Sequence, residues 1–479
     1  MTRSIRFPFK YRAVRVLLCG LCLAVSTGAW ADESVTVFIG GTVIDGNGGE
    51  PLTDATLLVA GKEIVAVGPR DEVDVPDGAR IIDASGHYLL PGFIDVNVHV
   101  SAYRGGETLL RYADRQAELV AEHAQLHLKY GVTTIRDSYG ALGPLVEIRD
   151  AIAAGELVGP RLKVAGNIVG WGGPCSVSFS MVRPDDCHPR EREFNDEITM
   201  GVSGEDLLTM TPDELGDAIG RYLDLGPDHL RYGAVTHFAD PAFITFSPDA
   251  QRAIVKAAHA RGIAVETHST TLEGMRIPIL AGVDMLLHPE LLLREVPDWL
   301  LDMVAERELL CGFRATSVTG EAWQAHLDSG DARDGEGLSL QRHNAERFIK
   351  GGCVPAVGND NHLWIAPELR DAPRSEGPRG PQQHAGLGTL LAIEGLVELG
   401  LTPGEAIVAA TRNGAKAARG LDRYGTLAPG KLADVVMLER DPLADIANIH
   451  SLVLVMFEGT VIDRDALPTR PVWYGHPNF

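Results

Sequence analysis

Asn97 and His99 are a pair of residues whose types and spacing suggest chemistry. They stand two positions apart in the apolar stretch FIDVNVHV, residues 93–100. Because side chains alternate between the two faces of a strand, both should point the same way, with the neighbouring valines pointing the other way. Such a pair can hold a metal ion, but asparagine is only a weak, neutral oxygen donor. A metal site, a weakened one and the remains of one are all consistent with this pattern.

The elements that position this pair form a repeated pattern of apolar strands separated by helix signals. The expected strands are residues 93–100, 132–138, 161–169, 229–235, 264–269, 285–290, 310–317 and 354–360. Eight strand-helix units of this kind predict an α/β fold, a (β/α)8 TIM barrel. A doubly wound open sheet is the alternative, but no glycine-rich nucleotide-binding motif opens a helix after a strand.

Helix starts are marked clearly at several places. Ser247-Pro248 is an N-cap followed by a first-turn proline, and the segments that begin at Thr211 and Thr402 are capping boxes with proline at the first helical position. These signals predict helices that begin near residues 212, 248 and 403.

The two ends of the chain read differently from the middle. Residues 34–90 and the segment after residue 424 contain short strands and turns, so the ends are expected to form one small β-sandwich domain together. The predicted organisation is a signal peptide at 1–31, β-sandwich segments at 32–90 and 425–479, and the barrel at 91–424.

The N-terminal segment has the composition of a secretory signal. Five basic residues precede the apolar run LLCGLCLAV, and Ala29-Trp30-Ala31 offers small residues where a signal peptidase cuts. The alternative is a retained anchor, although the run is shorter than the ~20 residues of a membrane span. Cleavage after Ala31 predicts a periplasmic or secreted protein and changes the formal net charge from −22 to −27. That charge argues against binding to nucleic acid or to a membrane surface.

Four cysteines remain after cleavage. Cys175 and Cys187 flank a polar segment, and in an oxidising compartment a disulfide between them would close that loop. Four unpaired thiols are the alternative. No CxxC pair remains that would indicate a thiolate zinc site.

If the barrel is right, the polar residues at the carboxyl ends of its strands matter most, because barrel active sites lie at that face. Taken singly, a histidine in an apolar strand is more often a hydrogen-bonded core residue than a metal ligand. Here, however, six polar residues are expected together at the carboxyl rim of the barrel: Asn97, His99, Arg231, His268, His288 and Asp360.

Several segments together resemble the amidohydrolase superfamily, especially its imidazolonepropionase and prolidase-like branch. The strand signature LLPGFIDVNVHV resembles the family's first strand, AVETHS and AGVDMLLHPE its fifth and sixth, and VGNDN its eighth. The longest match is the segment from LTPGEAIVAATRNG to LADVVMLERDPL. The resemblance covers nearly all of the chain after the signal and implies a hydrolase with one or two divalent metals in a barrel.

The resemblance also implies roles for the rim residues. His99, His268 and His288 would be metal ligands, and Asp360 would bind metal and accept the proton of the attacking water. Neutral imidazoles and a carboxylate suit Zn²⁺, and the cation lowers the pKa of a bound water to about 7.

Three departures from the family pattern indicate that a two-metal centre is broken. Asn97 replaces the first histidine of the usual His-x-His, and Arg231 stands where a carboxylated lysine often bridges two metals. Arginine stays protonated and repels a nearby dication. Gly172-Gly173-Pro174 stands where relatives often have Gly-Gly-His.

Two outcomes therefore stay open. In the first, one divalent metal, zinc before manganese or iron, is held by His99, His268 and Asp360, with Asn97 as a weak fourth ligand or as a hydrogen-bond donor to a ligand. His288 would bind the metal, orient water, shuttle protons or polarise the scissile carbonyl. The protein is then an exported hydrolase that cleaves an amide or cyclic amide C–N bond, other than a peptide bond, of a small molecule or dipeptide-like substrate. Arg231 would hold an anionic part of that substrate. In the second, the cavity is metal-free and serves a binding protein or a lyase.

Other residues carry weaker signals. His237 and Asp240 could reach a substrate from the loop after the fourth strand, but a position on the loop surface is the favoured expectation. Glu266 is expected to orient a ligand or pair with Arg231. Trp171 and His384 lie in the long segments 170–210 and 362–385, which are interpreted as walls of a substrate pocket. Substrate identity and the question of a homo-oligomer stay open.

Overall fold

The structure is a computed structural model. It describes residues 34–102, 106–173, 175–179, 189–190, 202–237, 242–329, 332–363, 366–369 and 384–477. The expected signal peptide lies outside these residues, as do Cys187, Asp240 and much of the two segments interpreted as pocket walls.

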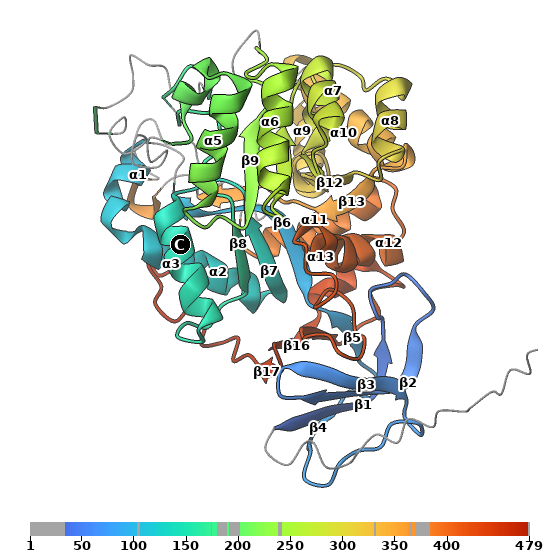
Figure 1. The fold of residues 1–479 in the computed structure, drawn as a ribbon. Helices are drawn as coiled ribbons and strands as arrows, with labels where there is room; N and C mark the ends of the chain where they lie inside the picture. Colours follow the sequence, from blue (N-terminus) through green and yellow to red (C-terminus); the bar gives the residue numbers. More distant parts are fainter. Residues whose placement is uncertain are drawn as a thin grey trace, which may run out of the picture. The chain divides into compact units, whose positions relative to one another are not determined.

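Parallel strands alternate with helices through the middle of the chain (Figure 1). The strands are β6 (Phe93–Ala102), β7 (Val132–Asp137), β8 (Arg161–Val164), β9 (His229–Gly233), β10 (Ala264–His268), β11 (Met285–Leu287), β12 (Leu310–Phe313) and β13 (Val354–Val357). All eight expected strands are present. Several end earlier than the sequence suggested, because the chain turns where polar residues follow the strand: His288 and Asp360 have left-handed backbones, with φ of 37° and 59°.

Helices occupy the intervals between these strands and follow the last of them. Within the described residues they are α1 (Gly106–Arg111), α2 (Gln116–Lys129), α3 (Leu142–Ala153), α5 (Pro212–Leu223), α6 (Pro248–His259), α7 (Leu272–Ala281), α8 (Asp298–Ala305), α9 (Gly320–Ser329), α10 (Ala332–Lys350), α11 (Leu387–Glu398), α12 (Pro403–Val408) and α13 (Gly414–Ala417). The three helix starts predicted from caps are confirmed at α5, α6 and α12, where Thr211, Ser247 and Thr402 accept the expected backbone hydrogen bonds.

The barrel strands belong to two hydrogen-bonded sheets, β14-β6-β7-β8 and β13-β12-β11-β10-β9, where β14 is Asn361–Leu363. Backbone hydrogen bonds cross both seams. The Asp228 N–H donates to the Val164 carbonyl at 2.8 Å between β8 and β9, and the Asp360 N–H donates to the Asn97 carbonyl at 2.8 Å beside β6. The α/β barrel architecture predicted from the sequence is confirmed.

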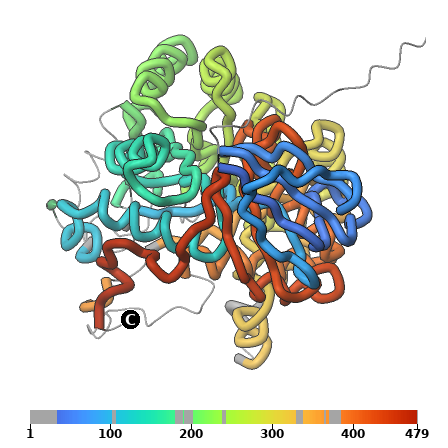
Figure 2. Tube along the Cα trace, turned by 90° about the horizontal axis from the view of Figure 1, so that it is seen from below, coloured from blue at the N-terminus to red at the C-terminus, as the bar shows by residue number. Residues whose placement is uncertain are grey.

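Both chain ends build one additional β domain, as expected. Its strands are β1 (Val35–Val43), β2 (Leu52–Ala60), β3 (Glu63–Pro69), β4 (Arg80–Asp83), β5 (Tyr88–Pro91), β15 (Val435–Leu438), β16 (Leu452–Phe457) and β17 (Thr460–Val461). They run in one continuous sheet rather than in two separate hydrogen-bonded layers. Antiparallel pairing of β5 with β15 joins the ends, and Figure 2 shows the blue N-terminal strands beside red C-terminal ones.

Disulfides are present, so the alternative of four unpaired thiols is wrong. Cys311 on β12 is bonded to Cys353, which directly precedes β13, and the two Cα atoms are 6.2 Å apart. Cys175 is also disulfide-bonded, but the predicted partner Cys187 lies outside the described residues. Among the helices of the described segments, none has the length and apolar character that crossing a bilayer requires.

Candidate active site

Asp360 is the centre of one group of site residues. Its Oδ1 lies 3.1 Å from Asn97 Nδ2 and 3.0 Å from His99 Nε2, and its Oδ2 lies 3.5 Å from Arg314 Nη1. The expectation that Asn97 and His99 share one face of their strand is therefore confirmed, since both reach the same oxygen. Burial alone would raise the pKa of Asp360, but the hydrogen bond to His99 and the positive charge of Arg314 hold it well below its usual value.

The His99 ring lies between two acceptors. Its Nδ1 is 3.2 Å from the Tyr139 carbonyl oxygen, and its Nε2 faces Asp360 Oδ1. A carbonyl and an ionised carboxylate only accept hydrogen bonds. The ring therefore satisfies both neighbours only when positive charge, a proton or a cation, lies between Nε2 and the carboxylate.

Arg231, His288 and His268 form the second group. Arg231 Nη2 lies 3.2 Å from His288 Nε2, and His288 Nδ1 lies 3.1 Å from His268 Nδ1. Burial first, and then the Arg231 charge, lower the pKa of His268 to about 3. Burial first, and then the field of His268, lower the pKa of His288 well below its usual value. Both rings are consequently neutral near pH 7.

The proton positions in this second group follow from the arginine, which only donates. His288 Nε2 must accept from Arg231, so the His288 proton is on Nδ1 and is donated to His268 Nδ1. The His268 proton is then on Nε2, a buried atom with no hydrogen-bond partner among the described residues. His268 thus presents an unused N–H donor in the barrel interior.

Aromatic rings flank His268. The His237 ring stacks on Trp171, with centroids 5.0 Å apart and planes 8° apart, and meets His268 edge-on at 4.4 Å. Trp171 is itself buried and donates its indole N–H to the Val235 carbonyl. The expectation of a loop-surface His237 is wrong, because the chain after β9 turns back over the barrel interior. His384 instead lies against Tyr474, near the C-terminus.

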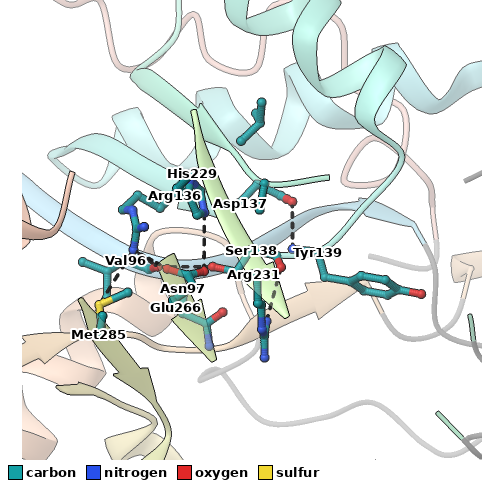
Figure 3. Close-up of polar contacts among 12 residues, drawn as sticks. Val96, Asn97, Arg136, Asp137, Ser138, Tyr139, His229, Arg231, Glu266 and Met285 are labelled. Carbon is teal, nitrogen blue, oxygen red and sulfur yellow. Dashed lines mark hydrogen bonds and ion pairs between the residues drawn. The ribbon is translucent and has the colours of Figure 1, made fainter. Parts of the chain in front are cut away.

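Glu266 also differs from expectation, as the close-up in Figure 3 shows. It lies beside Arg231 in the β9–β10 register, but its carboxylate pairs with Arg136 from β7 at 2.7 Å and lies 3.4 Å from His229 Nε2. The ion-pair partners of Glu266 are therefore Arg136 and His229 rather than the expected Arg231, and the alternative that Glu266 orients a ligand stays a prediction. Arg136 points into the barrel from β7, and no sequence pattern distinguishes it from the other residues of that strand.

Three further buried acids hold the backbone that carries the site. Asp95 accepts the N–H groups of Asn97 and Asn359 and so ties β6 to the turn before Asp360. Asp137 accepts the N–H of Tyr139, whose carbonyl contacts His99. Burial raises the pKa of Asp95 to about 7 and that of Asp137 to about 8.

The third of these acids positions Arg314. Glu290 accepts the Arg314 N–H at 3.0 Å, and burial raises its pKa to about 7. The sequence interpretation missed Arg314, although it directly follows β12 and the rule that selected the other rim residues would have selected it.

The structure thus separates the expected ligand set of Asn97, His99, His268, His288 and Asp360 into two groups. In the part of the chain that the structure describes, no three His, Cys, Asp or Glu side chains lie together as a metal-binding group. The Asp360 group still fits one divalent cation chemically, because it combines a carboxylate, an imidazole nitrogen and the buried Asn97 Oδ1, which has no hydrogen-bond partner in the described residues.

A barrel with histidines and an aspartate at the carboxyl ends of its strands, joined to a β domain made from both chain ends, defines an amidohydrolase-type hydrolase. The amidohydrolase family profile matches residues 88–292 and 388–462, more than half of the sequence. This chain belongs to the amidohydrolase family, whose members typically use a divalent metal.

Relatives of known activity match along most of their length. Ochratoxinase of Aspergillus niger is 27% identical over 460 residues, which cover 87% of this chain and 84% of the relative. Imidazolonepropionase of Symbiobacterium thermophilum is 27% identical over 429 residues, covering 81% and 86%.

Solved structures are similar as well. Molinate hydrolase has 31% identity and a TM-score of 0.84, with 93% of this chain and 98% of that chain covered. Phenylurea hydrolase B has 30% identity and a TM-score of 0.83, with 93% and 100% covered.

Proposed function

We propose that this protein is a hydrolase that cleaves a C–N bond of a small amide-type molecule and that it depends on a single divalent ion. The observation that carries the proposal is the contact of His99 Nε2 with Asp360 Oδ1 at 3.0 Å, while Nδ1 faces the Tyr139 carbonyl. This arrangement requires positive charge between the ring and the carboxylate.

His99, Asp360 and Asn97 would hold the ion. Three protein ligands with an open position are usual in catalytic zinc sites, and the oxygen and nitrogen donors suit zinc first, with manganese or iron as alternatives. When bound, the ion supplies Lewis-acid polarisation and lowers the pKa of water.

The residues of the chain then divide the remaining work. Asp360 is held ionised, so it accepts a proton from the attacking water and returns it to the leaving nitrogen. The His268 Nε2–H donates to the oxygen of the scissile carbonyl. His288 and Arg231 fix the tautomer of His268, a role that replaces the ligand role expected for His288 and the substrate-anion role expected for Arg231.

The names of three of the similar proteins support the proposed substrate class. By their names, molinate hydrolase and phenylurea hydrolase B act on molinate and on phenylureas, and ochratoxinase acts on an ochratoxin. We propose a small amide, cyclic amide, urea or carbamate-type substrate rather than a peptide. Export to the periplasm or the medium is proposed from residues 1–31 alone.

A metal-free binding protein or lyase is the second candidate. It is favoured by the hydrogen-bond chain from Arg231 through His288 to His268, because that chain leaves His268 Nε2 protonated and unable to ligate a cation. Under this candidate, a proton rather than a metal ion lies between His99 and Asp360.

Metal analysis and a substrate screen test the two candidates together. Protein purified after growth with zinc or manganese should carry about one metal ion per chain and hydrolyse members of a panel of N-acyl amino acids, dipeptides, lactams, lactones, ureas and carbamates. His268→Asn should keep the metal and lose turnover, whereas His99→Asn should lose both. Protein without metal after either growth would favour the second candidate.

A further inference from the structure

A cavity of about 470 Å³ opens at the end of the barrel opposite the candidate active site. Its walls come from the first residues of β10, β11 and β12, from the turns that lead into these strands, and from α13 with the residues that follow it. The residues of the candidate active site, by contrast, lie in the strands or at their carboxyl ends, and none of them is at the start of a strand. The cavity is therefore a separate feature of the fold.

Positive charge predominates in the lining. The charged lining residues are Arg136, Arg307, Lys416, Arg419, Asp284 and Glu308, four cations against two anions. One cation and one anion of this set pair with each other, because Asp284 contacts Arg419 at 3.1 Å; Asp284 also lies 2.8 Å from His259. This balance opposes that of the whole chain, which has 65 acidic and 43 basic residues.

Two of these cations have little or no compensation from the protein. The Lys416 side chain is exposed and makes no hydrogen bond or ion pair within the described residues. Arg307 donates a hydrogen bond to the Met303 carbonyl at 3.2 Å, but its carboxylate contact, with Glu306, is 3.9 Å long, too long for a strong ion pair.

Arg136 reaches the cavity from the barrel interior. Its guanidinium is 2.7 Å from Glu266, and Nη1 lies 3.7 Å from the sulfur of Met285, another lining residue (Figure 3). A buried guanidinium in the same cavity lining as the exposed cations Lys416 and Arg307, neither of which has a carboxylate of the described residues closer than 3.9 Å, is an arrangement that a multivalent anion would stabilise.

We propose that this cavity binds a small anion that carries at least two negatively charged oxygens, a phosphate or a dicarboxylate. The anion bridges Lys416 and Arg307 at the mouth and approaches Arg136 at the floor. The site is independent of the proposed hydrolase activity, because it shares no residue with the candidate active site.

Calorimetric titration of the full chain with inorganic phosphate, and separately with succinate, tests the proposal. Saturable binding of one anion per chain is expected for at least one of the two, and Lys416→Glu and Arg307→Glu should each weaken it about tenfold or more. Both side chains are exposed, so the variants should fold, and the melting temperature checks this.

Arg252→Glu is the matched control, because Arg252 is an exposed arginine of α6 outside the cavity and the variant changes the net charge equally. Binding by this variant should equal that of the unaltered chain. The proposal is overturned if neither anion binds saturably, or if Lys416→Glu and Arg307→Glu weaken binding no more than Arg252→Glu does.

Discussion

Arg136 and Glu266 form an ion pair inside the barrel, with the guanidinium nitrogen 2.7 Å from the carboxylate oxygen and side-chain exposures of 2% and 0%. Glu266 is the register partner of Arg231, so the pair lies beside one member of the group that fixes the His268 tautomer. Removing one partner of such a pair leaves the other charge buried, which costs more than the pair itself contributes.

Glu266→Gln should therefore destabilise the protein strongly. The expected loss is about 3–5 kcal/mol of unfolding free energy, because the Arg136 charge remains without its carboxylate. Urea denaturation followed by circular dichroism measures the loss.

Glu273→Gln is the control for this change. Glu273 pairs with Arg276 at 2.6 Å on the surface, with side-chain exposures of 51% and 38%, so its loss should be below about 1 kcal/mol. If Glu266→Gln and Glu273→Gln lowered the free energy of unfolding equally, the buried ion pair would not stabilise the protein more than the surface pair does.

The cost of Glu266→Gln should also depend on pH. Burial alone would raise the pKa of Glu266, but Arg136 and then His229 lower it to about 2, from 4.5 for an unperturbed glutamate. A lowered folded-state pKa stabilises the protein above pH 4.5, and this contribution is lost as the pH falls toward 2. The stability difference between the unaltered chain and Glu266→Gln should shrink over that window, and a constant difference would refute the assignment.

Much of the fold was predictable because it follows from local pattern. Eight apolar runs bounded by turn residues gave eight strands, and capping boxes at Thr211 and Thr402 gave helix starts, since both signals depend on residues close in sequence. The one-sheet character of the β domain was not predictable, because it depends on how β5 and β15 meet across more than 300 residues.

For the candidate site, the sequence predicts which side chains of one strand share a face, but not which side chains of different strands meet. Alternation correctly placed Asn97 and His99 together, whereas the partner of Glu266 depends on which side chain from β7 crosses the barrel interior. Cys311 and Cys353 are likewise neighbours only because β12 and β13 are adjacent. Contacts of this kind arise from the tilt and closure of the barrel, which no local pattern encodes.

Arg314 should prove important for turnover. Arg314→Met removes the cation 3.5 Å from Asp360 Oδ2 and should lower kcat/KM about 10²-fold on the best substrate of the panel. Its side chain is partly exposed, so the melting temperature should change little. Arg307→Met, a change of the same type at the opposite end of the barrel, should leave kcat/KM unaltered; if both variants were equally active, Arg314 would have no role in the reaction.

Asp360→Asn should abolish turnover without unfolding the protein. The amide cannot accept the proton of the attacking water, and a fall of about 10²–10⁴-fold in kcat is expected. The measurement combines the substrate assay with circular dichroism, which should match that of the unaltered chain. Full residual activity would refute the assignment of Asp360 as the base.

Asn97→Asp should make stability strongly dependent on a divalent ion. In the present structure Asn97 Nδ2 lies 3.1 Å from Asp360 Oδ1, so the substitution places a second carboxylate beside the first, and the two repel each other when no cation is bound. A carboxylate is also a stronger ligand than an amide oxygen, so bound zinc should reverse the loss of stability.

The melting temperature of Asn97→Asp with excess chelator should fall below that of the unaltered chain, and added zinc should raise the melting temperature by more in the variant than in the unaltered chain. Asp95→Asn, two residues earlier on the same strand, alters a carboxylate that hydrogen-bonds backbone N–H groups and Thr389, and its melting temperature should not respond to zinc more strongly than that of the unaltered chain. If zinc leaves the melting temperature of Asn97→Asp unchanged, Asn97 does not face a cation site.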